Sequence, residues 1–187
     1  MGALVARMVA GQTLEVPYTL DDMAADAFGL LDALDVERAH VAGASMGGMI
    51  VQAMALAHPE RVRTLTSIMS STGNPSLPPA SPEAMGALTS AVPADLDGYL
   101  ARSVELARVI GSPGFPFDET RTRERARLAF ERGLYPQGTA RQMAAIVAHG
   151  NRRPRLEQLS VPALVIHGSA DPLVPVHGGR DTQEALQ

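Results

Sequence analysis

The spacing of apolar residues predicts a helix near the start of the chain. Apolar side chains recur every three or four positions over residues 20–34, which is the spacing of one helical face. Thr19 stands where a helix N-cap is expected, and Asp21 and Asp22 follow in the first turn, where negative charge is favourable. The polar stretch 35–37 ends the pattern. A further short helix is expected over residues 2–10.

Short apolar runs elsewhere predict buried strands. They cover residues 38–43 and 65–69 and a third run that begins at Val161. A helix is expected between the first two, over residues 48–57. Because strands that alternate with helices build parallel sheets, these segments predict an α/β fold.

The middle of the chain has a different pattern. Residues 70–82 are rich in Ser, Thr, Asn, Gly and Pro, which is typical of a linker. Residues 83–150 are helical in pattern. Asp95 and Asp118 are the expected N-caps of two of their helices, and a third is expected over residues 137–149.

A five-residue motif at the end of the first strand carries the chemistry. Gly43-Ala44-Ser45-Met46-Gly47 reads G-x-S-x-G between a predicted strand and a predicted helix. In that context the motif predicts a nucleophile elbow, a sharp turn that exposes a serine hydroxyl at a helix N-terminus. Side chains at Gly43 and Gly47 are expected to collide with the strand and the helix.

This motif and its surroundings resemble the α/β-hydrolase family. The resemblance covers residues 18–71 and the segment from Val161 to Asp171, which is similar to the family's later strand and acid-bearing loop. The finer likeness is to the polyketide methylesterases of anthracycline tailoring and related bacterial esterases. The resemblance implies a partial parallel sheet with helices on both faces and an inserted helical cap. The predicted domains are core over 1–71, cap over 72–155 and core over 156–187.

The resemblance also implies roles for individual residues. Ser45 would be the nucleophile, the Met46 backbone N–H would help to hold the oxyanion, and Asp171 would be the acid that orients a histidine. Asp171 precedes a proline, so a turn-capping aspartate is the alternative. Family members place the catalytic histidine after the acid, but here only His177 follows, six residues on.

The histidine and the early strands are therefore expected to lie outside this chain. None of His40, His58, His149 and His167 has the right place for a base. Nothing before Tyr18 resembles the loop that gives the second oxyanion donor. The chain is expected to be the middle of a hydrolase, whose uncovered sheet edges favour self-association.

Composition narrows the possible chemistry. The chain has no cysteine, and all 16 basic residues are arginine, so thiol and lysine chemistry are excluded. No metal and no cofactor are expected. The net charge of −4 gives no reason to expect nucleic acid or an anionic membrane as a partner. No apolar run has transmembrane length, and a cytoplasmic location is expected.

Two groups of residues have competing interpretations. Four apolar residues could roof the active site or simply pack the cap: Leu100, Phe130, Tyr135 and Met143. Three arginines at the return from the cap could bind a substrate carboxylate, although structural pairing is favoured: Arg152, Arg153 and Arg155.

The sequence therefore predicts a serine hydrolase that acts on a small hydrophobic carboxylic ester through an acyl-enzyme at Ser45. The first alternative is a catalytically incomplete hydrolase-like fragment or binding module. An acyltransferase, a C–C hydrolase or a perhydrolase of the same fold is a further alternative.

Overall fold

A computed structural model describes residues 15–187 of the chain. The helix predicted over residues 2–10 lies outside this range. Three strands form the sheet: β1 (Ala39–Ala44), β2 (Val62–Ile68) and β3 (Ala163–Ile166). The elements around them are α2 (Leu20–Ala33), α3 (Met46–Ala57), η1 (Pro59–Arg61), α8 (Arg153–Leu156) and α9 (Val176–Ala185).

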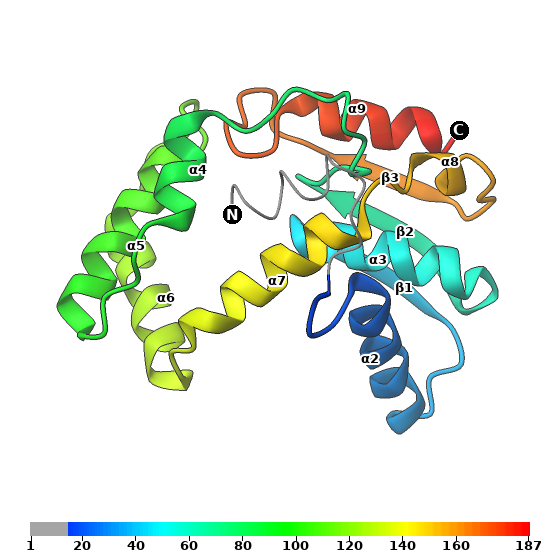
Figure 1. Cartoon of the computed structure of the whole chain (residues 1–187), viewed down its shortest axis with the longest axis horizontal. Helices are drawn as coiled ribbons and strands as arrows, with labels where there is room; N and C mark the ends of the chain where they lie inside the picture. The colour runs from blue at the N-terminus through cyan, green and yellow to red at the C-terminus, as the bar shows by residue number, and fades with distance from the viewer. Residues whose placement is uncertain (1–14) are drawn as a thin grey trace.

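A run of four helices interrupts this core between β2 and α8. We call α4 to α7 the inserted helices: α4 (Pro82–Thr89), α5 (Leu96–Ile110), α6 (Glu119–Arg132) and α7 (Pro136–His149). In Figure 1, α4, α5 and α6 stand to one side of the sheet, and α7 leads back towards it. Asp95 and Asp118 cap α5 and α6 as predicted, each accepting a bond from the backbone N–H three residues on.

The sheet is parallel, with the order β1-β2-β3. All strand carboxyl ends therefore meet at one edge, where ligands bind in open α/β sheets. The predicted α/β class and the adjacency of the three strands are confirmed. α3 packs on β1 and β2, and α9 packs on β3. The core between α2, α3 and the sheet includes Phe28, Met54 and Leu65.

Local spacing explains why α2 begins where it does. Thr19 accepts a hydrogen bond from the backbone N–H of Asp22, while the Asp22 carboxylate accepts one from the Thr19 backbone. This capping box satisfies two N–H groups that a helix start leaves unpaired. Asp21 also lies in the first turn, where it complements the helix dipole.

The prediction of helices on both faces of the sheet is wrong for residues 15–187. Alternate strand residues follow the pleat, so Leu65 and Ser67 point to the helix-covered face and are buried. The opposite face carries Ala42, Leu164 and Ile166, and the last two are 55% and 47% exposed. Self-association through the edges of this sheet stays a prediction.

The four apolar residues of the predicted roof have different environments. Leu100 is buried within the inserted helices. Phe130 packs against Tyr99 with ring centroids 5.4 Å apart, and Tyr135 is largely exposed. Only Met143 lines the cavity that contains Ser45. Within residues 15–187, none of the helices has the length and apolar character needed to cross a membrane.

Candidate active site

Ser45 lies at the sharp turn between β1 and α3. Its backbone has φ 56° and ψ −121°, a left-handed conformation that is rare for a residue with a side chain. Three backbone bonds hold the turn: the Ser45 N–H donates to Ile68 O at 2.9 Å, and the Ser45 carbonyl accepts from the N–H groups of Gly48 and Met49. The strained conformation is therefore held by the end of β2 and the start of α3.

The glycines around this turn differ in how much space an added Cβ atom would have. A Cβ at Gly43 would lie 2.0 Å from the carbonyl oxygen of Gly47. A backbone shift of a few tenths of an ångström would not relieve this clash. A Cβ at Gly47 would meet nothing, so the collision predicted there is wrong. Gly48 has that restriction instead, because its Cβ would lie 2.5 Å from the Ser70 Cβ.

Ser70 supports the turn from the end of β2. Its side chain is buried, and its hydroxyl donates to the Ser45 carbonyl at 2.8 Å. Met46, the first residue of α3, follows directly. The N–H groups of Gly48 and Met49 already donate to the Ser45 carbonyl. The Met46 N–H, at the very start of the helix, has no acceptor within the helix and is available to an anion beside Ser45.

Ser45 opens into a largely apolar cavity of about 310 Å³. Ser71 and Asn74 add polar atoms to its wall, which is otherwise formed by apolar side chains from both the core and the inserted helices, including Met85, Leu88, Met143, Ile146 and Val174. Ligand pockets are typically apolar with a few polar groups, and this volume is at the small end of their range.

Asp171 lies in the loop after β3. Its Oδ1 accepts hydrogen bonds from the backbone N–H groups of Leu173 and Val174, both at 2.9 Å, which is the turn-capping arrangement. Its Oδ2 lies 3.7 Å from His167 Nε2. The loop that Asp171 caps continues into the wall of the Ser45 cavity at Leu173, Val174 and Pro175.

None of the five histidines forms a hydrogen bond with Ser45 in the described residues. His167 has a buried side chain, and its Nε2 lies 2.7 Å from Val174 O. His177 is exposed at the start of α9, as expected. His40 pairs with Thr64 and His58 with Glu60. His149 is buried 4.0 Å from Asp21, and burial lowers its pKa.

The chain segments that lead into and out of the inserted helices meet beside the cavity. Gly73 and Gly150 have positive φ, and a Cβ on Gly73 would lie 2.2 Å from Gly150 O. The Arg152 N–H donates to Thr72 O at 2.8 Å. The two segments are therefore joined where they leave the core.

Arg152 is buried and bonded within the protein, so its side chain is not free to bind a ligand. Only 1% of its surface is exposed. Its guanidinium donates to Gln52 Oε1 at 3.0 Å and to Ser71 O at 2.8 Å. No carboxylate among the described residues forms an ion pair with it, and burial lowers its pKa to about 10.

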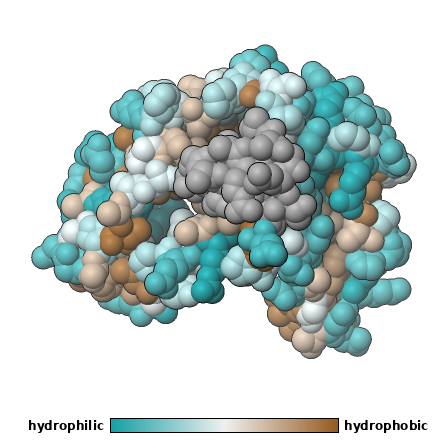
Figure 2. All heavy atoms as spheres, in the orientation of Figure 1, coloured by the Kyte–Doolittle hydropathy of each residue, from teal (hydrophilic) through white to brown (hydrophobic). Residues whose placement is uncertain are grey.

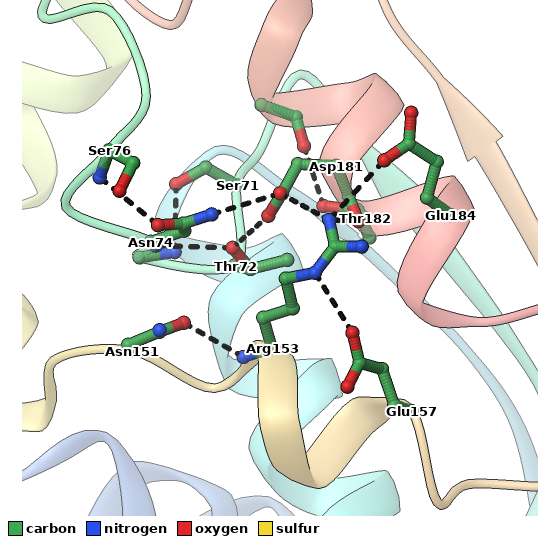
Figure 3. A network of polar contacts seen from close by, with 12 residues as sticks. Ser71, Thr72, Asn74, Ser76, Asn151, Arg153, Glu157, Asp181, Thr182 and Glu184 are labelled. Atoms are coloured by element: carbon green, nitrogen blue, oxygen red, sulfur yellow. Dashed lines mark hydrogen bonds and ion pairs between the residues drawn. The ribbon is translucent and has the colours of Figure 1, made fainter.

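Asp181 of α9 gathers a polar network at the same place (Figure 3). Its carboxylate accepts hydrogen bonds from the Thr72 hydroxyl and the Asn74 amide, and it forms an ion pair with Arg153. Asn74 also lines the Ser45 cavity. Asp181 thus connects α9 to both segments that carry the inserted helices.

Acid is expected to weaken this network. Burial alone would raise the pKa of Asp181, but the bonds from Thr72, Arg153 and Asn74 outweigh it and hold the pKa below its ordinary value. A depressed folded-state pKa stabilises the fold above the unfolded-state value, about 3.9 for Asp, and that contribution is lost as the pH falls through the folded-state pKa. The difference in unfolding free energy between the wild type and Asp181→Asn should therefore stay constant down to about pH 5 and shrink as the pH falls below about 4, through the lowered pKa of Asp181.

Urea titrations at a series of pH values measure this difference. Glu184→Gln is the matched control, because Glu184 also contacts Arg153, at 3.3 Å, but is exposed. The unfolding free energy of Glu184→Gln should follow that of the wild type across the pH range. A gap between wild type and Asp181→Asn that is the same at every pH would contradict the role given to the Asp181 charge.

Sequence reasoning missed several residues of this site. Ser70, Ser71 and Asn74 lie in the stretch that looked like a linker, and no local spacing rule marks them as cavity or turn residues. Gln52 likewise gave no signal, although it is fully buried between Arg152 and Ser67.

Comparison with known proteins places this geometry in a family. The sequence profile of the alpha/beta hydrolase fold matches residues 11–187. The rhodomycin D methylesterase of Streptomyces peucetius is 33% identical over 179 residues, which cover 85% of this chain and 60% of that protein. A 2-hydroxy-6-oxononadienedioate/2-hydroxy-6-oxononatrienedioate hydrolase of Paraburkholderia xenovorans is 34% identical, over 81% of this chain and 52% of that protein.

Solved structures agree on the fold. The meta-cleavage product hydrolase from Pseudomonas fluorescens matches with a TM-score of 0.68 at 22% identity, covering 91% of this chain and 61% of that one. The chain spans about 60% of the length of the methylesterases that it matches. The resemblance seen in the sequence is confirmed: the chain belongs to the α/β-hydrolase family.

Proposed function

We propose that this chain carries the nucleophile and the acid of a serine hydrolase that acts on small hydrophobic carboxylic esters. The observation that carries the proposal is the strained Ser45 turn, which opens into an apolar cavity at the carboxyl edge of the sheet. A strained backbone at such a position is typical of functional sites. The 33% identical methylesterase supports an ester as the substrate.

The proposed chemistry begins with attack of the Ser45 Oγ on the ester carbonyl carbon. The carbonyl oxygen becomes an oxyanion, and the Met46 N–H at the start of α3 stabilises its charge. Collapse releases the alcohol, which takes up the serine proton, and leaves an acyl group on Ser45. Water then attacks this acyl-enzyme, releases the acid and restores the serine.

Proton transfer in both steps needs a base. Asp171 is proposed to orient a histidine through its Oδ2, because Oδ1 is already bonded to two N–H groups of its own loop. None of the described histidines is bonded to Ser45, so we assign the base to polypeptide outside these 187 residues. A free serine is a weak nucleophile without such a base.

A binding module without turnover is the second candidate, and the lack of a histidine partner for Ser45 in the described residues favours it. The two candidates differ in the reactivity of Ser45. Acyl transfer, C–C bond hydrolysis and perhydrolysis would use the same serine. Measuring which substrates the site turns over would separate these three activities from ester hydrolysis.

A fluorophosphonate probe tests the proposal, with free imidazole supplied as a substitute base. General-base catalysis typically contributes 10²–10⁴-fold, so imidazole should accelerate labelling of Ser45 by at least about tenfold. Peptide mass spectrometry would locate the adduct. Ser45→Ala should abolish it, and Ser71→Ala, which changes a hydroxyl on the wall of the same cavity, should leave it in place. A folded sample that stays unlabelled with imidazole present would favour the binding module.

A further inference from the structure

The first turn of α9 contains two adjacent buried glycines, Gly178 and Gly179. Glycine destabilises the interior of a helix relative to alanine, so a pair of glycines there needs a local reason. The surface over α9 is mostly hydrophilic in Figure 2, because the exposed residues of this helix are polar, namely His177, Arg180, Gln183 and Glu184. The two glycines lie on the other side of the helix, which packs against the core.

The two glycines allow a close approach to two different parts of the site. A Cβ on Gly178 would lie 2.9 Å from the Ser71 Cβ and 3.0 Å from Ser70 O. A Cβ on Gly179 would lie 2.5 Å from His167 Nδ1 and 2.9 Å from both Cβ and Cγ of the same side chain. An added methyl group therefore fits at neither position unless a neighbour moves.

His167 connects Gly179 to the loop that carries Asp171. Its side chain is only 5% exposed, and its Nε2 lies 2.7 Å from Val174 O. A carbonyl oxygen can only accept a hydrogen bond, so Nε2 is the ring nitrogen that donates. The Val174 N–H in turn donates to Asp171 Oδ1. The His167 ring and the Asp171 carboxylate therefore hold the backbone of Val174 by its two polar groups.

Packing holds the His167 ring in place at a cost in hydrogen bonding. Within residues 15–187, His167 Nδ1 is the buried side-chain atom that has no hydrogen-bond partner, and it faces Gly179. Buried polar atoms are normally bonded, so the close approach of α9 is kept despite this cost. Asp171 Oδ2 lies 3.7 Å from His167 Nε2, which is too long for a hydrogen bond, so Oδ2 stays available to a base.

Gly178 connects the same turn of α9 to the nucleophile. It packs on Ser70 and Ser71, and the Ser70 hydroxyl donates to the Ser45 carbonyl. The first turn of α9 thus lies between the residue that supports the Ser45 turn and the residue that supports the Asp171 loop.

We infer that the first turn of α9 is a spacer that sets the position of Asp171 relative to Ser45, with Gly179 and His167 as positioning residues of the acid. Accurate spacing matters because a displacement of about 1 Å can cost about 100-fold in rate. The inference goes beyond the proposed function and rests on it for the roles of Ser45 and Asp171.

Hydrogen exchange tests the spacer without any chemistry at Ser45. Gly179→Ala should displace the His167 ring and speed exchange of the Leu173 and Val174 amides, which donate to Asp171, by about tenfold relative to the amides of β2. Gly29→Ala is the matched control, because a Cβ on this glycine of α2 would meet nothing within 4 Å. Unchanged exchange of the two amides in Gly179→Ala would overturn the inference.

A second variant separates the contact with His167 from general disruption of α9. His167→Gly removes the three atoms nearest to the added methyl group, together with the donor to Val174 O. It should itself speed exchange of the Leu173 and Val174 amides. Adding Gly179→Ala to His167→Gly should then have little further effect, since the methyl group has room. The same effect of Gly179→Ala in both backgrounds would contradict the inference.

Fluorophosphonate labelling with and without imidazole gives a readout that a merely structural role would not move. Gly179→Ala should lose most of the acceleration by imidazole, as Asp171→Asn should, because the acid no longer orients the base. The labelling rate without imidazole should stay as in the wild type, whereas damage to the Ser45 turn would lower both rates. Faster exchange with full imidazole acceleration would overturn the positioning role. A wild type that imidazole does not accelerate would count against the proposed hydrolysis, and the exchange experiment would still decide whether the spacer exists.

Discussion

Gly43→Ala should destabilise the fold by about 3 kcal/mol or more, the upper part of the range for overpacked sites. The added methyl group would lie 2.0 Å from the Gly47 carbonyl oxygen, and both atoms belong to backbone that the β1–α3 turn fixes. No side chain can rotate away to relieve the contact. The turn must open instead, and the bonds that hold Ser45 to Ile68 and to the start of α3 would be lost with it.

Gly47→Ala is the matched control, four residues along the same motif. Its methyl group would enter open space, and Gly47 lies inside α3. Because alanine favours helix more than glycine does, stability should be unchanged or rise by up to about 0.5–1 kcal/mol. Urea titration followed by far-ultraviolet circular dichroism measures both variants. Equal losses for the two would show that the motif's glycines serve something other than close backbone approach.

Arg152→Met should cost about 2–4 kcal/mol of unfolding free energy, because it leaves buried acceptors without donors. Gln52 Oε1 and Ser71 O would each lose a bond to the guanidinium, at a position where only 1% of the arginine surface reaches solvent. Methionine roughly retains the volume of the side chain. The loss of unfolding free energy therefore reports the missing hydrogen bonds and not the cost of an empty cavity.

Arg155→Met is the control three residues further on. Arg155 is exposed, and exposed substitutions usually change stability by no more than about 0.5 kcal/mol. The same urea titration serves both variants. A second measurement separates the bonds from general disruption: Gln52→Leu in the Arg152→Met background should lose less than it loses in the wild type, since its partner is already gone. Additive losses would argue against a direct bond.

Local features could be predicted from the sequence because their partners lie three or four residues apart. The capping box of Thr19 and Asp22 and the caps at Asp95 and Asp118 follow from such spacing. The Ser45 turn was also predictable, because its motif lies within one strand–helix junction. The limits of the strands were predicted less well. β2 begins at Val62, which is buried, and not at residue 65 as predicted.

Long-range features could not be predicted in this way. Gln52 and Arg152 are 100 residues apart, and Thr72 and Asp181 are 109 apart, so no periodicity relates them. The exposed sheet face was missed because Leu164 and Ile166 have the apolar character of buried strand residues. What covers a strand is decided by elements elsewhere in the chain, and apolar pattern alone does not report them.

The contact of Gly73 with Gly150 has a consequence for how this protein can change. The chain leaves the core and returns to it at one place. Further contacts with the core are few and come from Ser81, whose N–H donates to Pro172 O, and from α7, which packs on α2. The entropy of closing such a loop grows slowly with its length. The helices of this insertion can therefore be lengthened, shortened or exchanged, by evolution or by engineering, while the backbone of the Ser45 turn is kept.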